Sequence, residues 1–153
     1  MKFFLILAIV FSLFSASAVC QKNAPENIKK EFAVKFPAAQ NVKWGKEEDN
    51  EWEAEFKMNG KEMSASYDNS GKWLETETEI SSKDLPATIS AAIKIEFSGY
   101  KTGEMSLVEN PVLNGYEIAL KKGESSLEVI FDINGTVLKK TVLKEDYEDV
   151  EKK

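Results

Sequence analysis

The feature that most constrains this chain is an internal self-similarity, in which its second half resembles its first. Early in the chain the shift is 61 residues (86 − 25), and it pairs Pro25, Ile28, Phe32 and Phe36 with Pro86, Ile89, Ile93 and Phe97. Later the shift is 64 residues (116 − 52), and it pairs Trp52-Glu53, Tyr67-Asp68, Gly71 and Leu74 with Tyr116-Glu117, Phe131-Asp132, Gly135 and Leu138. A repeat of this length indicates one structural unit written twice. We therefore expect two tandem repeats, residues 21–80 and 81–144, and a charged tail, residues 145–153.

Each copy opens with a predicted helix. In the first copy Ile28, Phe32 and Phe36 recur every four residues, which gives the helix one apolar face. Pro37 ends that helix, and Gly99 ends its counterpart in the second copy. Asn23 and Asp84 are the expected N-terminal caps.

After each helix the apolar period changes from about four residues to two, which is typical of half-buried strands. Asn59-Gly60 and the segment Asp68 to Gly71 have the composition of hairpin turns. We predict eight strands, at about 41–47, 50–58, 62–68, 72–79, 102–109, 114–121, 125–132 and 136–143. The predicted fold class is α+β, with one helix packed on a four-stranded antiparallel sheet in each copy.

These patterns resemble the PepSY-like family of Bacteroidetes-type exported proteins, also called beta-lactamase-inhibitor-like. The residues that carry the resemblance are Phe36-Pro37-Ala38-Ala39 with Trp44, Trp52-Glu53-Ala54 with Phe56, and Tyr67-Asp68 with Gly71 and Leu74. The resemblance covers residues 24 to 143 as two copies, the second lacking the Phe-Pro and Trp positions. It implies a helix on a four-stranded sheet per copy, and it leaves open whether the two sheets join into one curved surface. It implies no established activity. In the relatives that inhibit β-lactamase the concave sheet face binds the enzyme, but no motif here marks an inhibitory residue.

The N-terminus has the pattern of a secretory signal, which we place at residues 1–20. Lys2 is followed by an apolar run from Phe3 to Phe14 and then by small residues. Cys20 is the only cysteine, and because the residues before it match a lipobox poorly, lipid anchoring is the less favoured interpretation. The sequence therefore predicts export to the periplasm or the extracellular space, with no membrane span in the mature chain.

Composition excludes several classes of function. The formal net charge of −6 argues against nucleic acid as a partner. The chain contains no histidine, so Ser-His and Cys-His catalysis is excluded and the usual nitrogen ligands of zinc, copper and iron are missing. We predict no enzyme activity, no catalytic residues, no metal site and no cofactor.

Carboxylates are the remaining chemistry. Three of them, Glu51, Glu53 and Glu55, alternate along one predicted strand, and Glu75, Glu77 and Glu79 alternate along another. A calcium site or a glycosidase-like acid pair is conceivable there, but we favour a solvated strand face. We likewise interpret Asp68 to Gly71 as a turn, because a calcium loop needs further ligands beyond it.

A sheet covered by helices on one side shows its other side to water or to a partner. If Leu74, Thr76 and Thr78 face the helix, alternation turns Trp73 outward together with neighbouring acids. The candidate binding residues on this open face are Trp73, Glu53, Glu55, Glu75, Ile130 and Val137.

The leading hypothesis is a non-catalytic module that recognises an extracytoplasmic protein or peptide, with inhibition of a hydrolase as its sharper form. The alternatives are a calcium-binding or carboxylate-based carbohydrate-active protein, and a structural envelope protein without a tight partner. The oligomeric state is left open.

Overall fold

The computed structural model describes residues 23–48 and 50–143 of the chain. The predicted signal segment, residues 1–20, and the predicted tail, residues 145–153, lie outside the described residues. Within them the order is a helix, four strands, a second helix and four more strands. The helices are α1 (Glu26–Lys35) and α2 (Ala87–Glu96). The strands are β1 (Gln40–Glu48), β2 (Glu51–Met58), β3 (Lys61–Asp68), β4 (Trp73–Glu79), β5 (Lys101–Glu109), β6 (Asn114–Lys122), β7 (Ser125–Phe131) and β8 (Val137–Leu143).

Both helices start directly after a proline. Pro25 and Pro86 occupy the N-cap positions, and no side chain caps either helix with a hydrogen bond. The expected caps, Asn23 and Asp84, are therefore wrong. The carboxylate of Asp84 instead accepts hydrogen bonds from the backbone and hydroxyl of Ser81, within the turn that precedes α2. Proline suits this position, because its fixed φ is compatible with helix entry and it lacks an N–H that would need a partner.

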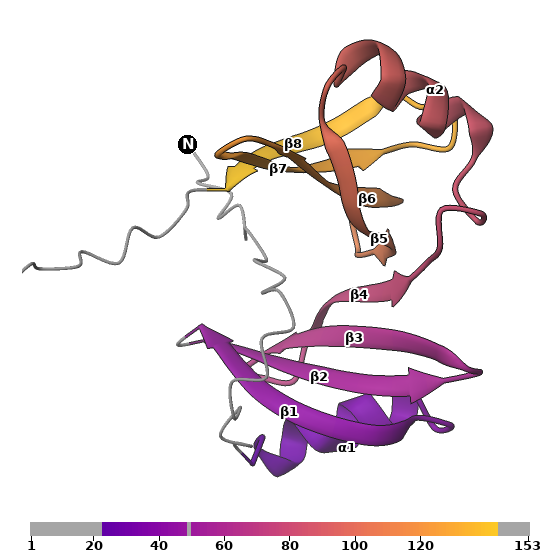
Figure 1. Cartoon of the computed structure of the whole chain (residues 1–153). Coiled ribbons are helices and arrows are strands. Elements are labelled where there is room, and N and C mark those ends of the chain that lie inside the picture. The colour runs from indigo at the N-terminus through magenta and orange to yellow at the C-terminus, as the bar shows by residue number, and fades with distance from the viewer. Residues whose placement is uncertain (1–22, 49, 144–153) are drawn as a thin grey trace, which may run out of the picture.

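All eight strands form one antiparallel sheet in the order β1-β2-β3-β4-β5-β6-β7-β8. Each strand therefore lies beside its neighbours in sequence. The α+β class is confirmed, and the question of whether the sheets of the two halves join is answered by the pairing of β4 with β5. The chain is thus a two-layer structure, with a helix covering each half of a continuous sheet (Figure 1).

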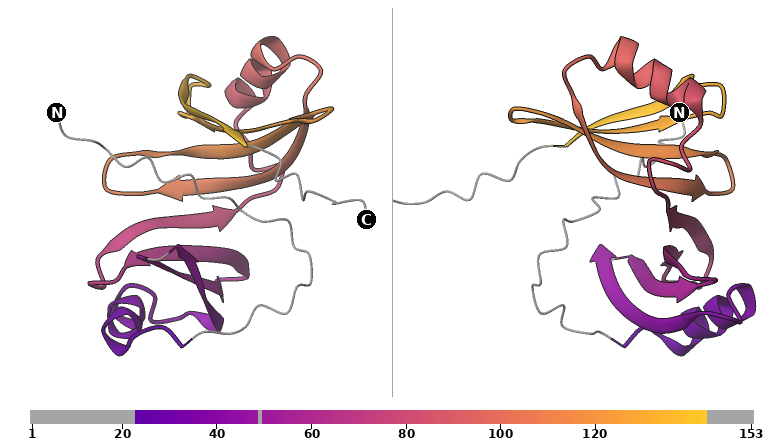
Figure 2. Two further views of the ribbon diagram at one scale, coloured as in Figure 1. Left: turned by 90° about the vertical axis from the view of Figure 1, so that its left-hand side faces the viewer. Right: turned by 45° about the vertical axis from the view of Figure 1, so that its right-hand side comes forward.

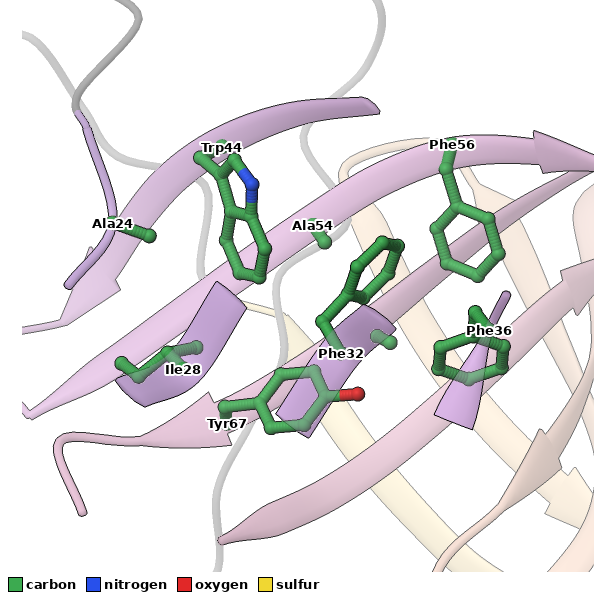
Figure 3. Packing of buried hydrophobic residues seen from close by; sticks show 9 residues of the cluster. Ala24, Ile28, Phe32, Phe36, Trp44, Ala54, Phe56 and Tyr67 are labelled. Atoms are coloured by element: carbon green, nitrogen blue, oxygen red, sulfur yellow. The ribbon is translucent and has the colours of Figure 1, made fainter. Parts of the chain in front are cut away.

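Two hydrophobic clusters fix the helices to the sheet. In the first, the ring of Phe32 on α1 lies 5.4 Å from that of Phe36, 5.3 Å from Trp44, 5.0 Å from Phe56 and 6.4 Å from Tyr67, measured between ring centroids. Figure 3 shows these side chains between α1 and the strands. Tilted and edge-on ring pairs at such distances are favourable beyond the area that they bury. In the second cluster, Ile89 and Ile93 of α2 pack with Ile118, Leu120, Val129 and Phe131.

The sheet is strongly curved, and the helices lie on its outer side. The two views of Figure 2 place α1 and α2 at opposite ends of the molecule, with β4 and β5 between them. The helix-free face of the sheet is consequently the inner face. We call it the concave face, and define it by Glu53, Ser66, Glu77, Val108, Glu117 and Ile130, which the strand register places on one side.

Two register shifts overturn part of the predicted orientation. In β4 the register moves between the pairs Ser66–Glu75 and Tyr67–Trp73, so Leu74 is an extra residue. Trp73 therefore falls on the same side as Tyr67 and packs on the first cluster, with the Lys35 Nζ of α1 3.7 Å from the centroid of its ring. The prediction that Trp73 points away from the helix is wrong, because such a bulge shifts the alternation by one residue.

The second half contains the same irregularity. Between the pairs Ile130–Lys139 and Phe131–Val137 the register shifts again, and Leu138 is the extra residue. Val137 packs on the second cluster beneath α2. Its predicted place on the open face is wrong for the same reason.

Candidate functional site

The concave face carries carboxyl groups on alternate strands. Glu53 lies on β2, Glu75 and Glu77 on β4, and Glu117 on β6. Between them the register places small side chains, namely Ser64 and Ser66 on β3 and Ser106 on β5. The side chains of glutamates two strands apart can therefore extend toward each other above the small serine side chains that separate them. This arrangement follows directly from the alternation of glutamates with apolar residues in β2 and with threonines in β4, which sends every second residue to the helix-free face.

Two of these four carboxyl groups are buried, and those of Glu75 and Glu117 are half-buried. Glu53 is 8% exposed, Glu77 is 6% exposed, and Glu128 on β7 is 8% exposed. Glu51 is also buried, whereas Glu55 and Glu79 at the ends of the same rows are exposed. The interpretation as a solvated strand face therefore applies to the ends of the rows and is wrong for their centre.

Burial disfavours the charged form of these acids. Burial, together with the carboxyls of Glu117, Glu75, Glu53 and Glu128, raises the pKa of Glu77 to about 9. Burial and the adjacent Glu47 carboxyl raise the pKa of Glu53 to about 8. A buried acid surrounded by other acids holds its proton, because desolvation and like charge act in the same direction.

The second half of the sheet contributes two further acids. Burial and the carboxylate of Glu128 raise the pKa of Glu117 to about 7, although the Lys139 ammonium opposes this. Burial also raises the pKa of Glu75, against a hydrogen bond that the Asn110 side chain donates to Glu75 Oε2 at 2.7 Å. At neutral pH the concave face therefore holds both protonated and ionised carboxyls.

An apolar patch lies beside the acids on the second half of this face. Ile130 is 3% exposed and Val108 is 1% exposed. Ile130 approaches Gly115 so closely that a Cβ on this glycine would lie 2.7 Å from Ile130 Cγ2. Leu138 also reaches Gly115, at 3.6 Å from the same Cβ position, and remains 46% exposed.

Of the six predicted binding residues, four lie on the concave face and two do not. Glu53, Glu55, Glu75 and Ile130 are placed there by the register, while Trp73 and Val137 lie on the helix side. The sequence pattern did not single out Glu77, Glu117 or Glu128 as binding residues. One signal was available, because Glu117 matches Glu53 in the internal self-similarity.

The arrangement offers acids and apolar side chains but no nucleophile with a histidine base. Across residues 23–48 and 50–143, no group of three or more acidic or cysteine side chains is placed to hold a metal ion. In the same part of the chain, no helix is long and apolar enough to cross a membrane.

Comparison with known proteins identifies the family. Residues 50–139, more than half of the chain, match the family model described as "Putative beta-lactamase-inhibitor-like, PepSY-like". This chain belongs to the PepSY-like family. The predicted family resemblance is thereby confirmed. None of the curated proteins matches the sequence.

Solved structures of similar fold come from species of Bacteroides. A BLIP-like protein of Bacteroides fragilis is 19% identical, has a TM-score of 0.70, and is matched over 83% of this chain and 92% of its own. A DUF2874 family protein of Bacteroides ovatus is 22% identical, with a TM-score of 0.71 over 84% of this chain and 94% of its own. A Bacteroides eggerthii protein described as one of the "putative periplasmic proteins" is 20% identical, with a TM-score of 0.70 over 83% of this chain and 94% of its own. At these identities the likeness establishes the PepSY-like fold, and no catalytic family is indicated.

Proposed function

We propose that this PepSY-like protein is an exported, non-catalytic binding module that recognises a protein or peptide through the concave face. The observation that carries the proposal is the gathering of Glu53, Glu75, Glu77 and Glu117 on one inward-curved surface. The carboxyls of this surface that are ionised at neutral pH favour a partner that presents lysine or arginine side chains, because complementary charge guides association and fixes orientation. Leu138, which is 46% exposed beside the buried Ile130, would contact the uncharged part of that partner.

The family name supports a sharper form of this proposal. The Bacteroides fragilis relative is called BLIP-like, and the family is called beta-lactamase-inhibitor-like. By analogy, this chain would inhibit a hydrolase by covering its active-site entrance with the concave face. The Lys2 and Phe3–Phe14 signal pattern supports export, in line with the periplasmic description of the Bacteroides eggerthii relative.

We also propose that the two halves are copies of one ancestral unit. In each half, the helix N-terminus contacts the turn that joins the last two strands. The Asn27 side chain donates a hydrogen bond to the Asn69 carbonyl oxygen at 3.2 Å, and the Thr88 hydroxyl donates one to the Ile133 carbonyl oxygen at 2.7 Å. These contacts fall at matching positions of the self-similarity and support a duplication.

The test is capture of partners from the extracytoplasmic fraction of the source cells with three forms of the protein. The concave-face variant is Glu75→Lys with Glu117→Lys. The control variant is Glu96→Lys with Glu124→Lys, which makes the same charge change at exposed positions of α2 and of the β6–β7 turn. Circular dichroism checks that each variant is folded.

We expect a protein that is retained by the wild type and by the control variant and lost with the concave-face variant. Its affinity should fall by about tenfold or more on charge reversal, which corresponds to about 1.4 kcal/mol, and should weaken in high salt. Retention of the same proteins by all three forms would contradict binding through the concave face.

A further inference from the structure

The two halves of the sheet meet at a short junction. β4 and β5 are paired from Thr76–Glu109 to Glu79–Ser106, whereas β2 and β3 are paired along their full lengths, from Glu51–Asp68 to Met58–Lys61. Two further hydrogen bonds extend the junction, from the Ile80 N–H to the Met105 carbonyl oxygen and from the Asn110 side chain to Glu75. Each half has its own helix and its own hydrophobic cluster, and neither cluster contains residues of the other half. The β4–β5 junction is therefore where the two halves can most easily change their relative orientation.

Buried and half-buried acids lie on both sides of this junction. Glu53, Glu75 and Glu77 belong to the first half, and Glu117 and Glu128 to the second. Glu77 sits in the junction itself, paired with Val108. The carboxyls of Glu117 and Glu128 in the second half raise the pKa of Glu77, and so do those of Glu75 and Glu53 in the first half. Charge on these groups would push the halves apart across the concave face, because like charges in a buried setting repel strongly.

The surrounding charges on this face are mostly negative as well. The further acids on the same side of the strands are Glu47, Glu51, Glu55, Glu79 and Glu104. The register places four cations there, Lys43 on β1, Lys101 on β5, Lys121 on β6 and Lys139 on β8. A further acid, Glu62, forms an ion pair with Lys57 near the turn between β2 and β3, away from the junction. Lys139 of the second half acts on Glu75 of the first half and on Glu117 of its own half, so it offsets part of the repulsion across the junction as well as within the second half.

We propose that the concave face is a proton-operated hinge, in which protonated carboxyls let the two halves close across β4 and β5, and ionised carboxyls drive them apart. Glu77 and Glu117 are the central pair, because Glu77 lies in the junction and the Glu117 carboxyl, on the strand that follows β5, acts on it. Opening and closing the face would change both the shape and the charge that it presents. The hinge concerns the face proposed above for binding, but it does not depend on that face having a partner.

The direction of titration agrees with this geometry. With pKa values of about 9 for Glu77, about 8 for Glu53 and about 7 for Glu117, these carboxyls are protonated at pH 5.5 and largely ionised at pH 9.5. The hinge should therefore be closed at the lower pH and open at the higher one.

The distance between the two helices measures the hinge directly. Spin labels are attached to Lys30→Cys on α1 and Ala91→Cys on α2, both exposed, in a chain carrying Cys20→Ser so that no native cysteine reacts. Pulsed electron paramagnetic resonance gives the distance between the labels at pH 5.5 and pH 9.5. The hinge variant is Glu77→Gln with Glu117→Gln, which keeps both positions neutral. The control variant is Glu96→Gln with Glu124→Gln, which removes two exposed acids away from the concave face.

We expect the label distance to differ between the two pH values in the wild type and in the control variant, and to stay at its pH 5.5 value in the hinge variant. Equal distances at both pH values in the folded wild type would overturn the proposal, and this result does not depend on the hinge variant folding. A pH-dependent change that persists unaltered in a folded hinge variant would also overturn it. Since the experiment contains no partner, a negative result leaves the binding proposal standing.

Discussion

Tyr67 combines a fully buried ring with a hydroxyl that lacks a partner. The residue is 1% exposed and packs in the first hydrophobic cluster against Phe32. Among the described residues, no hydrogen-bond partner is found for its hydroxyl oxygen. Burial, with a smaller contribution from the Glu31 carboxylate, raises the pKa of Tyr67 to about 12. The hydroxyl is therefore neutral and costs free energy to bury.

Replacing Tyr67 by phenylalanine should stabilise the fold. The variant keeps the ring packing and removes the unpaired polar group, so we expect the free energy of unfolding to rise by about 1 kcal/mol. The matched control is Tyr100→Phe, since the Tyr100 hydroxyl lies 3.2 Å from the Ser125 hydroxyl and that hydrogen bond would be lost. Urea denaturation of both variants checks the prediction, which is contradicted if Tyr67→Phe is the more destabilised of the two.

At the scale of the elements, the strand ends were largely predictable. Alternation placed strands at 50–58 and 125–132, and the structure has them at Glu51–Met58 and Ser125–Phe131. The bulges in β4 and β8 were missed, and with them the orientation of Trp73 and Val137. A local signal existed, because Trp73-Leu74 and Val137-Leu138 each place two large apolar residues side by side where alternation allows only one. Such a doublet does not say which of its residues turns toward the helix, since that is decided by packing.

The turn between β7 and β8 packs closely against the start of α2. Gly135 has a φ of +87°, and a Cβ there would lie 2.8 Å from the Thr88 carbonyl oxygen. Gly123, in the turn between β6 and β7, also has a positive φ, of +60°, but a Cβ there would have no atom within 4 Å. The two glycines thus share the conformational requirement and differ in the space around them.

Gly135→Ala should destabilise the protein much more than Gly123→Ala. Both substitutions place a side chain in the left-handed region at a cost of about 1 kcal/mol, and only the first also forces α2 away from its turn. We expect the difference between the two variants to be about 2 kcal/mol, measured by thermal or urea unfolding. Equal losses would show that the turn is not packed tightly against the helix.

At the scale of the whole molecule, the sequence placed the acids on one face and could not reveal their burial. Alternation alone put Glu53 and Glu75 on the helix-free side. Their pKa values are raised first by burial, to which the neighbouring Glu47 carboxyl adds for Glu53. Burial on a face that no helix covers depends on the curvature of the sheet. Curvature is a property of the complete sheet, set by strand twist and by bulges, so no single segment of the sequence carries it.

The buried acids predict an unusual dependence of stability on pH. In the unfolded chain Glu77 titrates near its ordinary value of 4.5, and in the folded protein near 9. Between these values the folded state binds the extra proton, so the stability that is present below pH 4.5 decreases as the pH rises toward 9. Glu77→Gln should remove much of this decrease, and at pH 9 the variant should be the more stable by on the order of 2 kcal/mol.

Thermal unfolding from pH 5 to pH 9 measures this slope. The control is Glu79→Gln, an exposed position in the same strand, which should follow the wild type closely. A wild-type stability that rises steadily over this range would be incompatible with buried, protonated carboxyls on the concave face.

The proposed binding surface and the proposed hinge both depend on the state of these carboxyls, and one measurement addresses it directly. Nuclear magnetic resonance of the glutamate side-chain carboxyl carbons, titrated from pH 3 to pH 10 and assigned with Glu53→Gln, Glu77→Gln and Glu117→Gln, gives the midpoint of each group. The structure predicts midpoints of about 8 for Glu53, about 9 for Glu77 and about 7 for Glu117. If all three instead titrate close to the ordinary value of 4.5, the concave face is an ordinary solvated surface. That result would contradict the burial of its carboxyls and their proposed role in a hinge.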